Sequence, residues 1–250
     1  MNPEVHEAGP ENAQVLSVFD FDGTLTRRDS FVPFLLFAFG KRVFFTRMVR
    51  MFPSGIRFLT KGLTRDELKA ALIASFLTGV REDWVQEQAV KFREAFWTRL
   101  MRPSGLKSVA SEVASGARVT ICSASPSLVI QPFAERLGIA LIGTELEVMD
   151  GLLTGSISGS NCRCEAKVHR LEASYGDLSL CRLRAWGDSR GDHELLAAAQ
   201  DAHWRHFHPS WKRGRLRIAK IGSRVQSKES MNSVTGVPGN GRGKNDRKGA

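Results

Sequence analysis

Three short apolar runs, each followed by polar side chains, constrain the fold of this chain more than any other feature. The runs lie at residues 15–19, 118–122 and 181–186. Runs of this length that are rich in β-forming residues predict buried strands. Helical stretches are expected between and after them, at 126–137, 165–173 and 192–200, with further strands near 140–145 and 204–207. Such alternation predicts an α/β fold, in which a parallel sheet carries helices on both faces.

The long segment between the first two strands lacks strand signals and is helical in character. Thr64 and Glu67 have the spacing of a capping box, and apolar residues at helical spacing follow them. Residues 81–101 carry a second apolar stripe of the same period. We therefore predict an inserted all-helical domain over residues 30–117, and a sheet domain that is built from residues 14–29 and 118–211.

Both ends of the chain have the composition of unfolded segments. Residues 1–13 are polar and include two prolines, which predicts a loose N-terminal arm. The net charge of the 250 residues is +10, and residues 212–250 carry +9 of it, with eleven Lys and Arg against two acidic residues. This segment is rich in Gly, Ser and Asn, so we predict a basic, largely disordered tail. Beyond the neighbouring Trp211 it lacks aromatic residues for base stacking, so nucleic acid is not the expected partner.

Polar side chains follow the three apolar runs, and the predicted fold brings them together. Asp20 and Asp22 follow the first run, Ser123 and Ser125 the second, and Asp188 and Asp192 the third, while Lys167 lies on an intervening helix. Open parallel sheets bind ligands at the carboxyl ends of their strands. Carboxylates, a hydroxyl and an ammonium suit phosphoryl transfer with Mg²⁺, because this cation prefers oxygen ligands and offsets the charge of a phosphate. Taken alone, the first pair of aspartates would also fit a turn or helix cap.

The four motifs around these residues resemble, in the same order, those of the haloacid dehalogenase (HAD) superfamily of phosphatases. Asp20-Phe21-Asp22-Gly23-Thr24-Leu25-Thr26 is similar to the first motif, and Cys122-Ser123-Ala124-Ser125 to the second. Lys167 within Cys162-x4-Lys167-Val168-x2-Leu171 is similar to the third, and Gly187-Asp188-Ser189-x2-Asp192 to the fourth. Within the superfamily, the chain looks most like the branch with phosphoserine phosphatase and phosphatidylglycerophosphatase C. The resemblance implies a Rossmann-like sheet core with a helical cap inserted between the first two motifs.

The resemblance also implies a role for each motif residue. Asp20 would be the nucleophile that forms an aspartyl-phosphate, and Asp22 would be the acid and base. Ser123 and the backbone amides around Ala124 would bind the phosphoryl oxygens, and Lys167 would neutralise charge on them. Asp188 would ligate Mg²⁺ beside the carboxylate of Asp20 and the main-chain carbonyl of Asp22. Asp192 would hold a metal-bound water or pair with Lys167, and Thr24 would contact the phosphate or cap a turn.

A second aspartate two residues after the first favours, within this superfamily, a phosphatase over a dehalogenase. The expected activity is therefore Mg²⁺-dependent hydrolysis of a phosphomonoester, although a phosphotransferase would carry the same motifs. The cap would select the substrate. Asp29 stands where the serine-specific enzymes carry an acidic residue that meets the substrate ammonium, or it is the N-cap of the first cap helix.

Eight of the fifteen phenylalanines lie between residues 31 and 59, interleaved with Lys and Arg. This pattern predicts an interfacial helix on anionic lipid or, alternatively, the aromatic core of the cap. The uninterrupted apolar part, residues 31–40, is too short to span a bilayer. The motif around Lys167 looks more like that of phosphatidylglycerophosphatase C than that of phosphoserine phosphatase. This resemblance and the aromatic pattern together rank a lipid phosphate such as phosphatidylglycerophosphate slightly above small soluble phosphates, including phosphoserine. The N-terminus lacks a signal-peptide pattern, so we expect a cytoplasmic protein that contacts the inner face of the membrane peripherally.

Two clusters of metal-binding residue types are interpreted as structural. Cys162, Cys164 and His169 lack the fourth ligand and the spacing of a zinc site. His203, His206 and His208 fall on or near the last expected strand, where neighbouring residues point to opposite faces, so we predict that they pack at the sheet edge.

Overall fold

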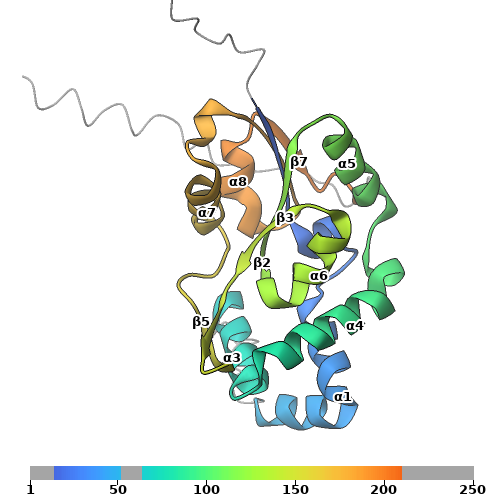
Figure 1. Ribbon diagram of the computed structural model, residues 1–250, viewed down its shortest axis with the longest axis vertical. Helices are drawn as coiled ribbons and strands as arrows, with labels where there is room; N and C mark the ends of the chain where they lie inside the picture. Colours follow the sequence, from blue (N-terminus) through green and yellow to red (C-terminus); the bar gives the residue numbers. More distant parts are fainter. Residues whose placement is uncertain (1–13, 52–63, 210–250) are drawn as a thin grey trace, which may run out of the picture. The chain divides into compact units, whose positions relative to one another are not determined.

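The centre of the computed structural model is a five-stranded parallel sheet, which confirms the fold predicted from the apolar runs (Figure 1). The structure describes residues 14–51 and 64–209; the predicted arm and tail, with Phe52 and Phe58, lie outside the described residues. The strands lie in the order β3-β2-β1-β6-β7, and every neighbouring pair is parallel. Their bounds are β1 Val15–Phe19, β2 Arg118–Pro126, β3 Ala140–Thr144, β6 Arg182–Gly187 and β7 Asp201–Trp204.

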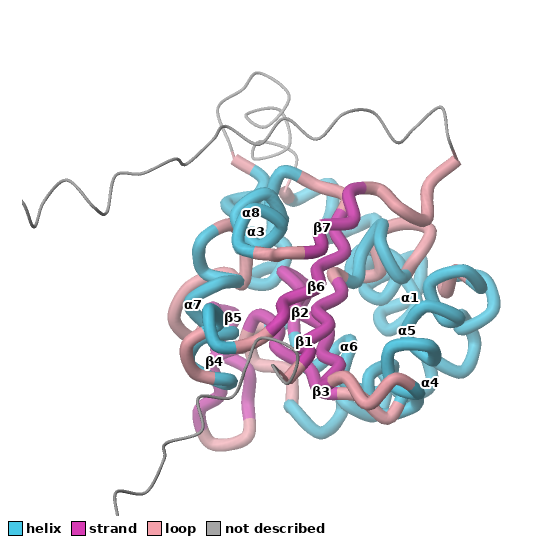
Figure 2. The backbone as a smooth tube through the Cα atoms, turned by 90° about the horizontal axis from the view of Figure 1, so that it is seen from above, coloured by secondary structure: helices cyan, strands magenta, loops and turns pink. Residues whose placement is uncertain are grey.

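Helices cover both faces of the sheet, because successive side chains of a strand point to opposite sides. Leu16 and Val18 of β1 cluster with residues of α7 (Glu165–Tyr175) and α8 (His193–Ala198). Phe19 belongs to the cluster on the other face, which includes residues of α6 (Ser127–Leu137). Seen from above, α7 and α8 lie on one side of the sheet and α5 and α6 on the other (Figure 2).

The segment predicted to be helical contains four described helices: α1 Phe31–Arg50, α3 Arg65–Leu77, α4 Glu82–Leu100 and α5 Pro103–Ala114. The predicted capping box begins α3, since Glu67 N donates to Thr64 Oγ1 at 3.2 Å and Thr64 N donates to Glu67 Oε2 at 2.6 Å. α5 packs on the sheet, where Ser17 Oγ of β1 donates to its Glu112 at 2.6 Å. We therefore call α1, α3 and α4 the cap, and α5 a helix of the sheet layer, although the expected insertion ran to residue 117.

The phenylalanines of α1 supply much of the core of the cap. Phe34 meets Phe92 of α4 edge-on with ring centroids 5.7 Å apart, and Phe44 lies 5.5 Å from Phe76 of α3. Arg47 closes this core, because its guanidinium lies over Phe76 and donates to the carbonyl of Phe76 at 2.9 Å. Of the six phenylalanines of this segment that the structure describes, Phe45 is exposed, at 60 %, and the others are buried or partly buried. The cap-core alternative thus accounts for most of the aromatic cluster.

A β-hairpin that the sequence analysis did not predict lies beside the cap. It follows the inserted segment in the sequence, and the described elements of that segment are all helices, as expected. A turn at Asp150-Gly151 joins β4 (Leu146–Met149) to β5 (Leu152–Ile157) as an antiparallel pair. Both turn residues have a positive φ, 52° and 75°, as a two-residue Asp-Gly hairpin turn requires. Leu153 N donates to Val80 O, and Gly79 N donates to Leu153 O, each at 2.8 Å. These bonds tie the hairpin to the connection between α3 and α4.

The segment after β6 differs from the prediction in two places. The helix expected at 192–200 is shorter, because a 3₁₀ turn, Arg190–Asp192, precedes α8 and Ala199, with ψ 139°, has already left the helical conformation. A second 3₁₀ turn covers Leu178–Leu180. β7 lies three residues earlier than the strand expected at 204–207, since Arg205 has a φ of 47° and turns the chain out of the strand. As a result His203 lies on β7, whereas His206 and His208 follow it. Within the described ranges, we find no helix that is both long and apolar enough to cross a membrane.

Candidate active site

The carboxyl ends of β1, β2 and β6 meet at one cleft of about 570 Å³. β1 lies between β2 and β6, where the order of the strands along the sheet reverses, and open parallel sheets bind ligands at this position. Residues that the sequence analysis placed directly after the predicted strands line the cleft, among them Asp20, Asp22, Ser123, Ala124, Ser125 and Asp188. The tertiary structure thus brings together residues that lie up to 168 positions apart in the sequence.

Lys167 of α7 holds two of the predicted carboxylates. Its Nζ lies 2.7 Å from Asp20 Oδ1 and 2.6 Å from Asp192 Oδ1, and its side chain is 1 % exposed. Burial by itself lowers the pKa of Lys167, but Asp192 and Asp20 outweigh burial and raise that pKa well above its ordinary value. Of the two alternatives for Asp192, the structure contains the pairing with Lys167. The other oxygen of Asp192 accepts hydrogen bonds from Ser189 N at 3.0 Å and Ser189 Oγ at 2.9 Å.

Asp20, Asp188 and Asp192 form an acidic group with the geometry of a metal site. One carboxylate oxygen of each lies within 4.8 Å of the others. Burial, followed by the charge of Asp192, raises the pKa of Asp188 to about 6 and the pKa of Asp20 well above its ordinary value. Asp188 Oδ1 is buried and has no hydrogen-bond partner among the described residues. Three carboxylates beside one ammonium, with one oxygen unpartnered, fit a hard divalent cation such as Mg²⁺.

The turn after β1 allows Asp188 to approach the first motif. Gly23 has a φ of 85°, and a Cβ at this position would lie 2.3 Å from Asp188 Oδ2, so a side chain there would collide with the acidic group. Thr26 closes the turn, because its Oγ1 accepts a hydrogen bond from Gly23 N at 3.1 Å. Thr24, expected to contact phosphate or to cap this turn, is buried, lies outside the cleft lining, and has an Oγ1 without a hydrogen-bond partner in the described ranges.

Asp22 is held by two serines and stands apart from the acidic group. Ser125 Oγ donates to its Oδ2, and Ser30 N donates to its Oδ1 at 2.8 Å. Burial, with a contribution from the charge of Asp29, raises the pKa of Asp22 to about 6. A carboxyl with this pKa exchanges its proton near neutral pH, as an acid and base must. Its side chain is therefore suited to proton transfer, while its main-chain carbonyl is the atom that the motif resemblance assigned to the metal.

We expect Asp22→Asn to stabilise the folded chain at pH 7.5 but not at pH 4. The amide can accept from Ser30 N and donate to Ser125 Oγ, so both contacts survive. The pKa of Asp22 rises from an ordinary 3.8 to about 6 on folding, so its burial costs stability only as the pH climbs through these values. The gain at pH 7.5 should be about 1 to 2 kcal/mol, because solvent reaches part of the carboxyl and screens it. Urea unfolding without divalent cations measures both values.

Asp150→Asn, in the hairpin turn, is the control for this prediction. An equal gain in stability for Asp22→Asn at both pH values would contradict the interpretation of Asp22 as a buried acid.

Asp29 lines the cleft and also contacts the start of a helix. Its Oδ1 accepts a hydrogen bond from Val32 N at 3.1 Å at the start of α1. The N-cap of α1 is Ser30, one residue after the expected Asp29, although the Asp29 side chain makes the contact with the first turn. The substrate alternative for Asp29 is compatible with its position, but the helix contact already occupies one oxygen.

The sequence analysis missed several basic and polar residues that line the cleft. Lys69 of α3 reaches across from the cap, where its Nζ donates to the carbonyl of Ala124 and lies 3.4 Å from Asn161 Oδ1. Burial lowers the pKa of Lys69, although Asp22 opposes this effect. His208, interpreted as a sheet-edge residue, lies with Nε2 2.9 Å from Gly23 O and 3.3 Å from Asp188 Oδ2. The cluster of histidines was the one sequence signal for His208, and nothing distinguished Lys69 from other cap lysines.

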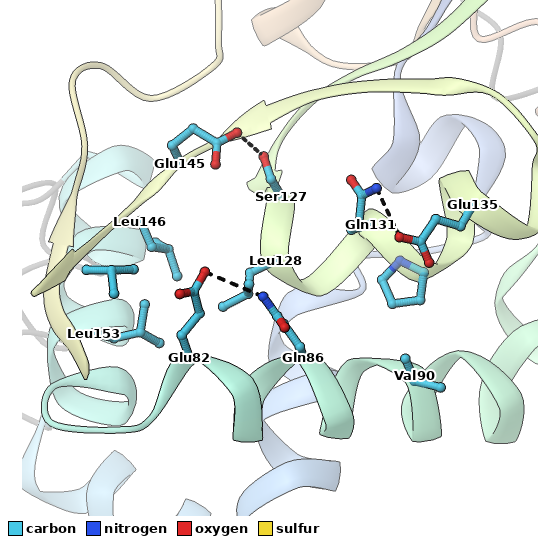
Figure 3. Close-up of a pocket in the computed structure, with 12 residues that line it drawn as sticks. Glu82, Gln86, Val90, Ser127, Leu128, Gln131, Glu135, Glu145, Leu146 and Leu153 are labelled. Atoms are coloured by element: carbon cyan, nitrogen blue, oxygen red, sulfur yellow. Dashed lines mark hydrogen bonds between the residues drawn. The ribbon is translucent and has the colours of Figure 1, made fainter. Parts of the chain in front are cut away.

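A second cleft, of about 390 Å³, lies between α4, α6 and the hairpin (Figure 3). Its floor is apolar, with Leu128 and Leu153, and its charged lining residues are Glu82, Glu135 and Glu145. Figure 3 shows hydrogen bonds within the lining, including the 2.5 Å bond from Ser127 Oγ to Glu145. A lining whose charged groups are all acidic repels phosphates, so this cleft does not suit the anionic substrate that the strand-end cleft can hold.

Comparisons with known proteins agree with this geometry. Residues 17–197 match the family described as haloacid dehalogenase-like hydrolase. Protein CicA of Caulobacter vibrioides is 40 % identical over 208 residues, which cover 82 % of this chain and 91 % of that protein. Two solved structures share the fold. A Bordetella pertussis protein described as of unknown function has a TM-score of 0.60 and 23 % identity, covering 74 % of this chain and 87 % of its own. A phosphoserine phosphohydrolase-like protein of Francisella tularensis has a TM-score of 0.51 and 20 % identity, covering 76 % and 86 %.

Proposed function

This chain belongs to the haloacid dehalogenase-like hydrolase family, and we propose that it is a phosphatase that hydrolyses phosphomonoesters through a covalent intermediate on Asp20. The observation that carries this proposal is the setting of Asp20. Its carboxylate lines the cleft 2.7 Å from the ammonium of Lys167, and the same cleft contains Asp22, whose pKa is about 6. A nucleophile, a cation and a group that exchanges protons near neutral pH are the parts that two-step phosphoryl transfer needs.

In the first step, a carboxylate oxygen of Asp20 attacks the phosphorus in line. The bond between phosphorus and the ester oxygen breaks, and protonated Asp22 gives its proton to the departing oxygen, so that the alcohol leaves. Lys167 neutralises charge on the transferred group, and Ser123 with the backbone around Ala124 positions its oxygens. The products of this step are the free alcohol and a phosphate ester of Asp20.

In the second step, water hydrolyses that ester. Asp22, now ionised, accepts a proton from the water as the water oxygen attacks the phosphorus, and the bond between phosphorus and Asp20 breaks. Inorganic phosphate leaves, Asp20 is again a carboxylate, and Asp22 is again protonated. One residue therefore serves as the acid and then as the base, which is why a pKa near neutrality matters more for Asp22 than for Asp20.

Mg²⁺ is the cofactor that we propose for this site. When bound, it supplies positive charge that offsets the repulsion between the phosphate and the carboxylates. Asp20 and Asp188 would hold it, and Asp188 offers the buried Oδ1 that lacks a partner among the described residues. Asp192 would act as a positioning residue, because both of its oxygens accept hydrogen bonds from Lys167 or Ser189.

Metal removal tests the proposal directly. We expect EDTA to lower phosphate release by about 100-fold or more and added Mg²⁺ to restore it, because the acidic group then lacks its counter-charge. Release is measured with p-nitrophenyl phosphate, phosphoserine, sugar phosphates, nucleotides and phosphatidylglycerophosphate in mixed micelles. A rate that EDTA leaves unchanged would contradict the metal proposal, and no release from any compound would contradict the phosphatase. If an added alcohol takes up most of the phosphate in place of water, the chain is a phosphotransferase.

Among phosphomonoesters, we propose a lipid phosphate as the substrate ahead of small soluble phosphates, because the outer surface of α1 favours it. Phe45, at 60 %, and Val49, at 71 %, are exposed one helical turn apart, with Met48 beside them. The exposed cations Lys41 and Arg42 lie one helical turn before Phe45, and the exposed Arg50 follows Val49 directly. Apolar side chains among cations are the pattern of a helix that rests on anionic lipid. We propose that this surface, the α1 face, contacts the membrane peripherally.

Replacing Phe45 and Val49 by serine tests the α1 face. Both side chains are mostly exposed, so the double variant should lose little stability. It should lower kcat/KM for phosphatidylglycerophosphate in anionic micelles by about tenfold, since two apolar groups no longer enter the lipid, and leave kcat/KM for p-nitrophenyl phosphate unchanged. Val113→Ser, exposed on α5 in the sheet layer, is the matched control. Equal rates of the double variant and the wild type on micelles would contradict the proposed lipid contact.

A further inference from the structure

A strongly basic recess, distinct from the two clefts described above, lies beside the active-site cleft. It has a volume of about 650 Å³ and is lined by Arg163, Asp188, Ser189, Arg190 and Arg205. Arg163, Asp188 and Ser189 also line the active-site cleft, so the two spaces adjoin. We propose that this arginine recess binds a second phosphate group of the substrate, next to the phosphate that Asp20 receives. The inference rests on the proposed phosphatase function, because it concerns the substrate of the same site.

The chain holds Arg163 in place with several structural features. Its Nη1 lies 3.4 Å from Asp66 Oδ2 of the cap. The aliphatic part of the Arg163 side chain packs against Gly191. A Cβ at Gly191 would lie 2.7 Å from Arg163 Cγ, so a side chain at residue 191 would displace the arginine. The following residue, Cys164, has φ 55° and ψ −132°, a conformation that L-residues rarely adopt, and its N donates to Gly191 O at 2.9 Å. Strained backbone of this kind often accompanies a functional position.

Arg205 is also fixed from several sides. Its φ of 47° is in the left-handed region, and its N donates to Gly187 O at 2.8 Å. Its Nε donates to the main-chain carbonyl of Asp188 at 3.0 Å, and its guanidinium lies 4.9 Å from the ring centroid of Trp204. Arg205 is therefore attached to the loop that carries Asp188. Arg190 is exposed and completes the recess from the same loop.

Three guanidinium groups around one recess select phosphate over other ligands. A guanidinium presents a planar set of donors that matches phosphate oxygens, and each such contact is a charge-assisted hydrogen bond. The one acidic lining residue is Asp188, which the proposed metal ion would neutralise. A substrate with a single phosphate, held at Asp20, would place no anion in this recess. A soluble bisphosphate, or a lipid with a phosphodiester close to its phosphomonoester, supplies the second group.

The test compares two substrates that differ by one phosphate. Propane-1,3-diyl bisphosphate and propyl phosphate are hydrolysed by the full chain, and kcat/KM is expressed per equivalent phosphate. We expect kcat/KM to favour the bisphosphate by about tenfold or more, mostly through a lower KM. A tenfold preference corresponds to about one charge-assisted hydrogen bond. Arg190→Gln should reduce the preference to about threefold or less and leave propyl phosphate unchanged. Arg118→Gln, exposed at the opposite end of β2, is the control for net charge.

The outcomes separate this inference from the proposed function. Equal kcat/KM for the two soluble compounds would exclude a second phosphomonoester and leave the phosphatase standing, and it overturns the arginine recess when Arg190→Gln also leaves phosphatidylglycerophosphate micelles unaffected. If neither soluble compound is hydrolysed, calorimetry measures their binding to Asp20→Asn. Tighter binding of the bisphosphate, lost when Arg190→Gln is added, supports the recess, and equal binding excludes a second phosphomonoester in the same way. Phosphatidylglycerophosphate micelles identify the source of the second group. An effect of Arg190→Gln on micelles alone indicates a phosphodiester, an effect on the soluble bisphosphate alone indicates a second phosphomonoester, and an effect on neither overturns the inference.

Discussion

Replacing Asp20 by asparagine should lower phosphate release by a factor on the order of 10⁴ or more, the size of loss seen when an enzyme loses its nucleophile. The amide has nearly the shape of the carboxylate, but it does not attack phosphorus. We expect the fold to survive, because Lys167 keeps its 2.6 Å pairing with Asp192, and one buried negative charge is removed from the acidic group. Steady-state hydrolysis of p-nitrophenyl phosphate with Mg²⁺ measures the loss.

The covalent step has its own signature. Acid quenching of the wild-type enzyme during turnover should leave phosphate on the peptide that contains Asp20, and Asp20→Asn should show none. Asp150→Asn is the matched control, because Asp150 occupies an exposed hairpin turn in which asparagine is equally well tolerated. Substantial turnover by Asp20→Asn, or phosphate on a different peptide, would contradict the proposed nucleophile.

Replacing Lys167 by methionine should damage both activity and stability. Turnover should fall by a factor on the order of 10² to 10³, because a cation that neutralises the transferred phosphate is lost. The free energy of unfolding should fall by about 3 to 5 kcal/mol at pH 7.5, since Asp20 and Asp192 lose a partner at 2.7 Å and 2.6 Å within a buried site. Urea unfolding and steady-state kinetics measure the two effects.

The stability loss in Lys167→Met should depend on pH in a defined direction. Without the ammonium, the pKa values of Asp20 and Asp192 rise in the folded chain, so the cost of their charge is greatest at high pH and disappears as they take up protons at low pH. The deficit should therefore be smaller at pH 5 than at pH 7.5. Lys107→Met, exposed on α5, should change stability by less than about 0.5 kcal/mol. A deficit that is constant with pH would point to poor packing of the new side chain in place of unpaired carboxylates.

The sequence alone determined the strands that carry the site and the residues at their ends. Each apolar run needs only five or six consecutive residues to indicate burial, and each motif follows its strand directly, so the pattern depends on neighbours along the chain. The capping box at Thr64 and Glu67 was predictable for the same reason, because its two hydrogen bonds join residues three positions apart.

Other features required contacts between distant segments. The hairpin β4–β5 is short, and its bonds to Gly79 and Val80 come from a segment more than seventy residues earlier. Whether the phenylalanines of α1 face lipid or a core depended on Phe76 and Phe92, which lie on other helices. Thr24 and Thr26 lie in the same motif, and the backbone of the turn decided which of them closes it.

The difference between local patterns and contacts of distant segments also separates the predicted part of the active site from the part that was missed. Asp20, Asp188 and Lys167 could be named because each stands in a local motif, although their mutual distances could not. Lys69 enters the cleft from the cap and His208 from the segment after β7, and the residues around both have ordinary patterns. Local burial and hydrogen-bonding preferences act over a few residues and are written in the sequence. Which cation reaches a phosphate depends on how whole segments pack, and only the tertiary structure decides that.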